Sequence, residues 1–141
     1  MPIQALLLKF WIANGSCMSK VVNIAQCFEK FSDTYSPKIV GELNGQNVML
    51  VRAEGDKIPW HSHDNEDEMF LVLEGVLNIL ERNKTTQINA GEFYIVPRGI
   101  EHRVVPEGKV KVMLFEPKDI AHTGNTKSDI TKDKFDRLEI N

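Results

Sequence analysis

The chain has 141 residues, a length typical of one domain and sufficient to bury a full core without a disulfide or a structural metal. Its 17 Lys and Arg residues nearly balance 20 Asp and Glu residues, and the net charge of −3 argues against a nucleic-acid or membrane-surface partner. Only two cysteines are present and no run of roughly 20 apolar residues is found, so the composition predicts a cytoplasmic domain without a membrane span.

The first 17 residues differ from the rest. Lys9 divides two short apolar runs, and no basic residue precedes them as in a secretory signal. From Met18 the chain reads like an ordinary start of translation. We therefore expect residues 1–17 to be a leader or upstream extension without a role in the fold, with a helical or targeting appendage as the alternative.

Residues 18–37 are predicted to form an N-terminal helix and a connection. Within 22–31, Asn23 can cap a short helix, and its apolar residues recur at spacings of three and four, as on one helix face. Ser36-Pro37 is expected to end this region, because a proline restricts the residue before it to extended conformations.

From residue 38 to about 117, short apolar runs alternate with turn residues. Asn44-Gly45 is a two-residue hairpin signal between Lys38–Leu43 and 46–53, and a type I turn is expected at 105–108. The other predicted strands are 58–61, 68–73, 76–81, 85–88, 92–96, 102–105 and 110–115. This spacing predicts an all-β antiparallel sandwich or barrel over 38–117, with residues 118–141 packed loosely outside as a peripheral tail.

Two short segments contain three of the four histidines. His61 and His63 are two residues apart, so on an extended chain both rings lie on one face. Glu68 begins the next apolar run, and His102 follows a Pro-Arg-Gly turn. Three neutral imidazoles and one carboxylate suit a divalent first-row ion (Fe, Mn, Ni, Cu or Zn) rather than Ca or Mg. Taken singly, each of these residues is more often a solvated surface group, so the hypothesis depends on the set.

The framing glycines make the pattern more specific. The two frames are Gly55-X5-His61-X-His63-X4-Glu68-X6-Gly75 and Gly91-X5-Pro97-X-Gly99-X2-His102. They resemble the two motifs of the cupin superfamily, and the chain is similar to small single-domain cupins often labelled as resembling phosphomannose isomerases. One departure is Pro106, where the second motif usually has Asn.

The resemblance implies a six-stranded double-sheet β-barrel, a relative of the jelly roll, with one divalent transition ion inside. By transfer of the motif positions, His61, His63, Glu68 and His102 are the implied metal ligands. The resemblance leaves activity open, because this barrel hosts isomerases, dioxygenases, decarboxylases and binding proteins.

Alternation along the strands predicts which side chains face the same interior. Phe70, Val72 and Val104 are expected to face inward with the ligands, and Trp60 and Met113 are candidate cavity walls. Three arginines could bring a cation to an anionic substrate, although each is by default a solvated surface residue: Arg52, Arg98 and Arg103.

Two functions of different class remain. One is a metalloenzyme that acts on a small oxygenated substrate as an oxygenase or an isomerase, with Glu68 as the catalytic base. The other is a metal-dependent domain that binds or senses a small molecule without turnover. Both expect a small-molecule partner and neither expects nucleic acid or a membrane; homodimer formation is left open.

Overall fold

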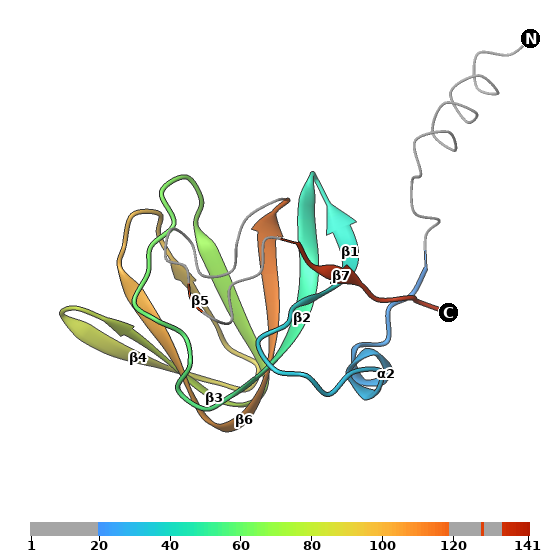
Figure 1. Cartoon of the computed structure of the whole chain (residues 1–141), viewed down its shortest axis with the longest axis horizontal. Coiled ribbons are helices and arrows are strands. Elements are labelled where there is room, and N and C mark those ends of the chain that lie inside the picture. The colour runs from blue at the N-terminus through green and yellow to red at the C-terminus, as the bar shows by residue number, and fades with distance from the viewer. Residues whose placement is uncertain (1–19, 119–127, 129–133) are drawn as a thin grey trace, which may run out of the picture.

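The computed structural model describes residues 20–118, 128 and 134–141, which form one short helix and seven strands (Figure 1). The leader predicted for residues 1–17 lies outside this part of the chain. The elements are α2 (Ile24–Glu29), β1 (Lys38–Leu43), β2 (Gln46–Glu54), β3 (Glu68–Glu81), β4 (Lys84–Asn89), β5 (Phe93–Val96), β6 (His102–Pro117) and β7 (Asp136–Arg137). None of the described residues belongs to a helix long and apolar enough to cross a membrane.

The strands form one sheet in the order β4-β3-β6-β2-β1-β7, and β5 pairs with β3. Long strands β3 and β6 run through the middle, while β4 and β5 lie on one side of the molecule and β1 and β2 on the other (Figure 1). The all-β fold with a short N-terminal helix and a peripheral C-terminal tail is therefore confirmed. The family resemblance implied six strands; the described residues form seven, and their hydrogen-bonded path ends at β4 and β7 rather than closing.

Two pairs of predicted strands are single strands. The ranges 68–73 and 76–81 join as β3, with register shifts on either side of Glu74. The ranges 102–105 and 110–115 join as β6, so the type I turn predicted at 105–108 is wrong. Pro106 is accommodated because β2 pairs with β6 only from Lys109 onward, and Pro106 therefore lies where β6 has β3 as its ladder partner.

The range 58–61 was also predicted as a strand, and this is wrong. Only His61 has ladder geometry, in an isolated bridge to His102. The Asn44-Gly45 hairpin is confirmed: both residues have positive φ, 52° and 76°, as a tight turn between twisted antiparallel strands requires.

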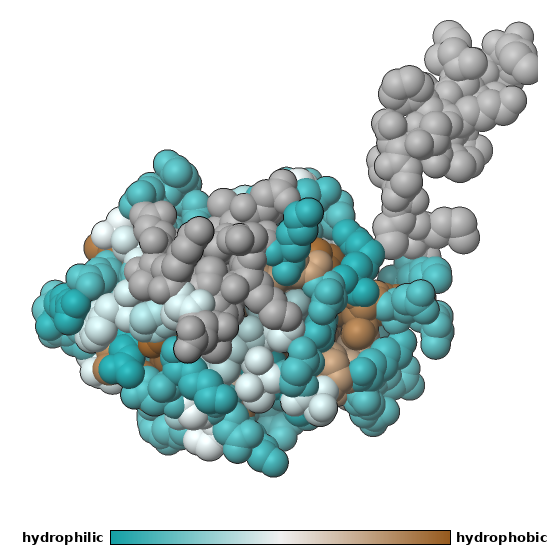
Figure 2. Space-filling view, viewed as in Figure 1, coloured by the Kyte–Doolittle hydropathy of each residue, from teal (hydrophilic) through white to brown (hydrophobic). Residues whose placement is uncertain are grey.

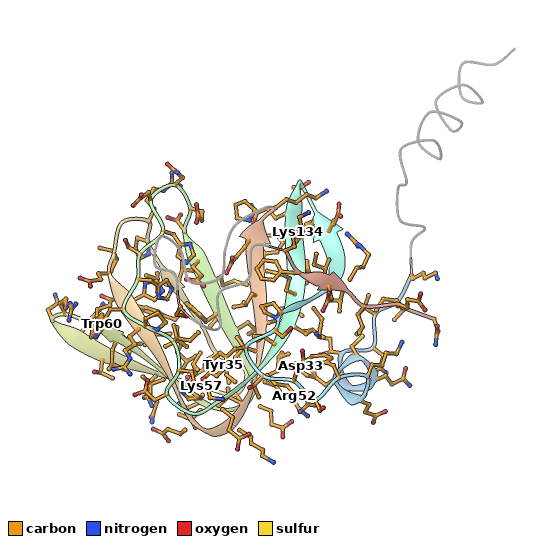
Figure 3. The ribbon with its side chains drawn as sticks, viewed as in Figure 1. Asp33, Tyr35, Arg52, Lys57, Trp60 and Lys134 are labelled. Atoms are coloured by element: carbon orange, nitrogen blue, oxygen red, sulfur yellow. The ribbon has the colours of Figure 1, made fainter. Side chains whose placement is uncertain are left out.

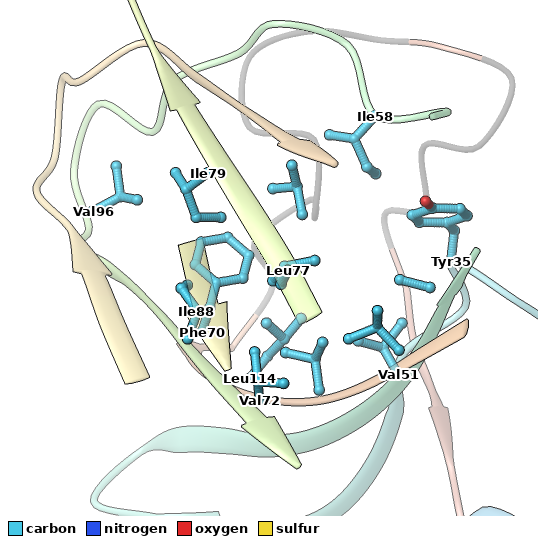
Figure 4. Packing of buried hydrophobic residues seen from close by; sticks show 14 of the residues in the cluster. Tyr35, Val51, Ile58, Phe70, Val72, Leu77, Ile79, Ile88, Val96 and Leu114 are labelled. Carbon is cyan, nitrogen blue, oxygen red and sulfur yellow. The ribbon is translucent and has the colours of Figure 1, made fainter. Parts of the chain in front are cut away.

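Apolar side chains pack on both faces of the sheet. The larger cluster fills the interior, with Tyr35 and Ile58 on one side and Phe70 and Val96 on the other (Figure 4). The smaller cluster joins α2 to the outer face of β1 and β2 and includes Phe28. Outside the grey residues, hydrophilic side chains cover most of the face seen in Figure 2.

The two ends of the described chain close this smaller cluster. Asn23 caps α2 by accepting a hydrogen bond from the Gln26 backbone N–H at 3.0 Å, as predicted. In the tail, β7 pairs in parallel with β1, and Leu138 and Ile140 pack against the cluster.

Gly75 should be the glycine least tolerant of a side chain. It has a φ of 86°, and a Cβ there would lie 2.6 Å from the backbone oxygen of Lys109. Gly91 has a φ of 85° with open space around its Cβ position and provides a matched control. We expect Gly91→Ala to lower the free energy of unfolding by about 1–2 kcal/mol, and Gly75→Ala by about 2 kcal/mol more, in urea titrations. Equal losses would show that the contact with Lys109 does not matter.

Candidate metal centre

Backbone pairing brings the two histidine segments together. The His61 N–H donates to the carbonyl of His102 at 3.0 Å, and the His102 N–H donates back at 2.9 Å. The Gly99 N–H donates to the carbonyl of His63 at 2.7 Å. Because His102 and Glu68 are the first residues of β6 and β3, this pairing places loop residues 61–63 beside both strands.

The four predicted ligands converge at one point. Their ligand atoms all lie within 4.8 Å of one another. Glu68 Oε2 lies 3.0 Å from His63 Nε2, 3.1 Å from His102 Nε2 and 4.0 Å from His61 Nε2. All four residues are at most 3% exposed, so the donors meet in an environment from which most water is excluded.

Each imidazole is oriented through its other ring nitrogen. His61 Nδ1 lies 2.8 Å from the carbonyl of Pro59, and His102 Nδ1 lies 2.9 Å from the carbonyl of Ile100. A carbonyl only accepts, so Nδ1 carries a proton in both rings, and in the neutral form that binds a metal Nε2 presents its lone pair to the centre. This arrangement is the usual support of a metal-bound histidine.

Glu66 orients the imidazole ring of His63 in the same way. Its Oε1 lies 2.7 Å from His63 Nδ1. Sequence reasoning placed Glu66 only in an acidic turn and missed this contact, because its spacing of three residues from His63 also fits a solvated loop.

One buried atom argues directly that the set fits a cation. His61 Nε2 is buried and has no hydrogen-bond partner among the described residues. A buried lone pair without a donor costs free energy, which a bound cation would recover. Three imidazoles and one carboxylate form the donor set of a first-row divalent ion, so the residues fit such an ion.

The electrostatics follow from burial and from Glu68. Burial, together with the neighbouring His102, lowers the pKa of His61 to about 4. Burial also disfavours the charged forms of His63 and Glu68, but contacts with neighbouring groups outweigh it. Contacts with Glu68 and Glu66 raise the pKa of His63. Contacts from His102 and His63 hold the pKa of Glu68 well below its usual range. Glu68 is thus the fixed negative charge of the site.

A cavity of about 40 Å³ adjoins the ligands and admits only a few non-hydrogen atoms. His61 and Glu68 line it, so two ligands belong to the cavity wall. Phe70 and Val104 line it as predicted, and Val72 lies in the same interior cluster.

Two predicted wall residues lie elsewhere. Met113 packs in the outer cluster, because it lies an odd number of residues from the inward-facing His102 along β6. The guanidinium carbon of Arg82 lies over the ring of Trp60, 3.8 Å from the centroid of that ring. Trp60 is therefore placed toward β4, away from the cavity (Figure 3). The cavity wall is completed instead by interior residues such as Val51, Ile58 and Leu114.

None of the three candidate arginines is among the described residues that line the cavity. Arg52 points toward α2 and donates to the carbonyls of Phe28 and Phe31 (Figure 3). Arg98 pairs with Asp67, and Arg103 pairs with Asp56. The prediction that these cations receive an anionic substrate therefore has no support in their placement.

Sequence reasoning also missed Glu116, a buried carboxyl near the end of β6. Along an uninterrupted strand, every second residue from His102 faces the interior, and this series includes Glu116. The turn wrongly predicted at 105–108 broke the count, so the signal was present but was not followed across it.

Comparison with known proteins identifies the family. The protein-family model described as "Cupin domain" matches residues 47–117. The Bacillus subtilis protein YdbB is 32% identical over 87 residues, which cover 61% of this chain and 76% of YdbB. The chain therefore belongs to the cupin family.

Two solved structures agree with this assignment. A cupin-2 domain protein from Shewanella frigidimarina is 37% identical, with a TM-score of 0.68 over 70% of this chain and 95% of that one. NMB1881 from Neisseria meningitidis is 25% identical, with a TM-score of 0.63 over 70% of this chain and all of that one.

The stability of the metal-free protein should depend on His61 in acid. The folded state lowers the pKa of His61 from 6.5 to about 4, so the unfolded chain binds the proton more readily. The resulting stability is fully present above pH 6.5 and is lost as the pH falls toward 4. We expect the wild type to lose up to about 3 kcal/mol more than His61→Gln between pH 7 and pH 4, measured by urea unfolding with a chelator present. A pH-independent difference between the two proteins would contradict this cause.

Proposed function

We propose that this cupin is a metalloenzyme that uses one divalent transition ion on a small oxygenated substrate, as an oxygenase or an isomerase. The ion would be held by His61, His63, Glu68 and His102. One observation carries the proposal: His61 and Glu68 belong both to the ligand cluster and to the wall of a cavity. A closed structural metal site has no reason to face a cavity, whereas a catalytic site needs one.

The residues around the ion would divide the work. The imidazoles, fixed through their Nδ1 atoms, hold the ion in place. An ion held by these four ligands would supply Lewis acidity toward an oxygen atom of the substrate. The apolar wall, including Phe70 and Leu114, excludes water from the reacting atoms.

Glu68 is the proposed catalytic base. It is the anionic member of the set, and it follows the acidic turn 64–67 instead of lying within the His-X-His pair. Its carboxylate lines the cavity and could accept a proton from a substrate bound there. Because each imidazole is held through its Nδ1 atom by a group other than Glu68, replacement of the carboxylate should leave the imidazole ligands in place.

The proposal is tested by loading the protein separately with Fe(II), Mn(II), Ni(II), Cu(II) and Zn(II). Oxygen uptake and deuterium exchange from ²H₂O are then followed with a panel of small hydroxyketones, enols and diols. Uptake would indicate an oxygenase, and exchange without uptake an isomerase. Ligands that bind the loaded protein without either reaction would instead favour the metal-dependent binding domain.

Replacement of Glu68 should separate catalysis from metal binding. Glu68→Gln keeps the shape of the side chain but removes its charge and most of its basicity. We expect this variant to retain a substantial share of the metal and to lose most turnover, roughly 100-fold or more per bound ion, as the loss of a general base typically costs. Metal content and rate must be measured on the same preparations.

His102→Ala serves as the comparison, because it removes an imidazole ligand and should lose metal and activity together. A wild-type rate per bound ion in Glu68→Gln would show that the carboxylate is only a ligand.

A further inference from the structure

Tyr35 has a backbone conformation that a bulky residue rarely adopts. It lies in the connection between α2 and β1, and its φ is 52°. Among the described residues other than glycine, only Asn44 also has a positive φ, and Asn44 lies in a hairpin turn that requires it. A tyrosine in this region of backbone conformation is strained, and such strain persists only where surrounding contacts impose it. A requirement other than local backbone preference therefore places Tyr35 here.

Hydrogen bonds at both ends of the residue impose this position. The Tyr35 N–H donates to the carbonyl of Arg52 at 2.8 Å, and the hydroxyl donates to the carbonyl of Gly55. Burial raises the pKa of Tyr35 to about 12, so the hydroxyl keeps its proton at neutral pH. The side chain of Arg52 donates in turn to the carbonyls of Phe28 and Phe31. The connection that carries Tyr35 is thus fixed against the end of β2.

These contacts direct the ring of Tyr35 into the interior (Figure 4). Tyr35 is 5% exposed and lines the same cavity as His61 and Glu68. In Figure 4 it lies across the interior cluster from Phe70, whose ring centroid is 6.2 Å from that of His102. The ring of Tyr35 is therefore a part of the cavity wall that the connection before β1 supplies.

We propose that Tyr35 is a specificity-determining residue, whose ring limits the substrates of the cavity to molecules of only a few non-hydrogen atoms. The cavity has a volume of about 40 Å³, and the phenol ring fills adjoining space that could otherwise hold part of a substrate. Apart from His61 and Glu68, the side chains that line the cavity are apolar or aromatic. The substrate would accordingly be apolar except for the group that faces the ion. The inference rests on the proposed function and adds the size and polarity of its substrate.

The first test uses the metal-free protein and benzene, a probe of about the size of the ring that Tyr35→Ala removes. The melting temperature is measured at increasing benzene concentrations, since a ligand that binds the folded state raises it. We expect Tyr35→Ala to bind benzene at least about tenfold more tightly than the wild type, because a dry apolar cavity of that size accepts benzene.

Tyr94→Ala is the matched control for this substitution. Tyr94 also packs against the interior cluster, and its hydroxyl donates to Glu81, but it is not among the described residues that line the cavity. This variant should bind benzene no more tightly than the wild type. If Tyr35→Ala does not fold, Tyr35→Gly takes its place, because glycine adopts a φ of 52° without strain.

The second test uses the protein loaded with Co(II) and two carboxylate probes, acetate and benzoate. The visible Co(II) bands report the binding of each probe. We expect the wild type to favour acetate, and Tyr35→Ala to reduce this preference at least about tenfold, because the removed ring leaves space for the ring of benzoate. Tyr35→Phe keeps the ring and loses only the hydroxyl, so its preference should stay within about threefold of the wild type, as should that of Tyr94→Ala.

Four results would overturn the inference. They are equal binding of acetate and benzoate by the wild type, an unchanged preference in Tyr35→Ala, an equal loss of preference in Tyr94→Ala, and benzene binding by Tyr35→Ala no tighter than by the wild type. Failure of the wild type to bind Co(II) would overturn the proposed function instead. The benzene titration would then still decide whether the ring of Tyr35 limits the cavity, so the two failures are distinguishable.

Discussion

The site depends on the reciprocal hydrogen bonds between the backbones of His61 and His102. They join a loop that has no strand of its own to the first residue of β6. Because His102 also pairs with Glu81 of β3 through the sheet, the loop is anchored to the middle of the molecule. Together with the hydrogen bond from the Gly99 N–H to the carbonyl of His63, this bridge holds the His-X-His pair opposite Glu68.

Three imidazoles and a carboxylate are buried together, which is an expensive arrangement in the absence of a cation. Contacts with His102 and His63 keep Glu68 charged although it is buried. His61 responds in the opposite way, since burial keeps its ring neutral. A neutral imidazole and a charged carboxylate are the forms that bind a metal, so the interior prepares His61 and Glu68 in their binding states.

The sequence predicted which four side chains converge more reliably than it predicted the strands, and the reason is physical. The spacing of His61, His63, Glu68 and His102 reflects a local requirement, since a pair at i and i+2 shares a face of an extended chain. Strand ends depend on partners far away in the chain. At Pro106 the local turn preference was overruled by pairing with Leu77 of β3, which no local pattern shows.

The same long-range pairing explains what was missed. Glu116 is 14 residues beyond His102, and only the continuity of β6 reveals that both face the interior. Likewise, the arginines near the motifs were candidates by sequence proximity, but Arg98 and Arg103 pair with aspartates outside the cavity. Which polar groups face a cavity is decided by the register of the sheet, and register is a property of two strands.

The central claim is that one ion binds between the three imidazoles and Glu68. X-ray absorption at the edge of the bound metal, combined with metal analysis of the same sample, tests it most directly. The account predicts one ion per chain, with three imidazole nitrogens and a carboxylate oxygen in its inner shell, and no bound ion in the His61→Ala, His63→Ala double variant. Full occupancy in that variant, or an inner shell without imidazole scattering, would contradict it.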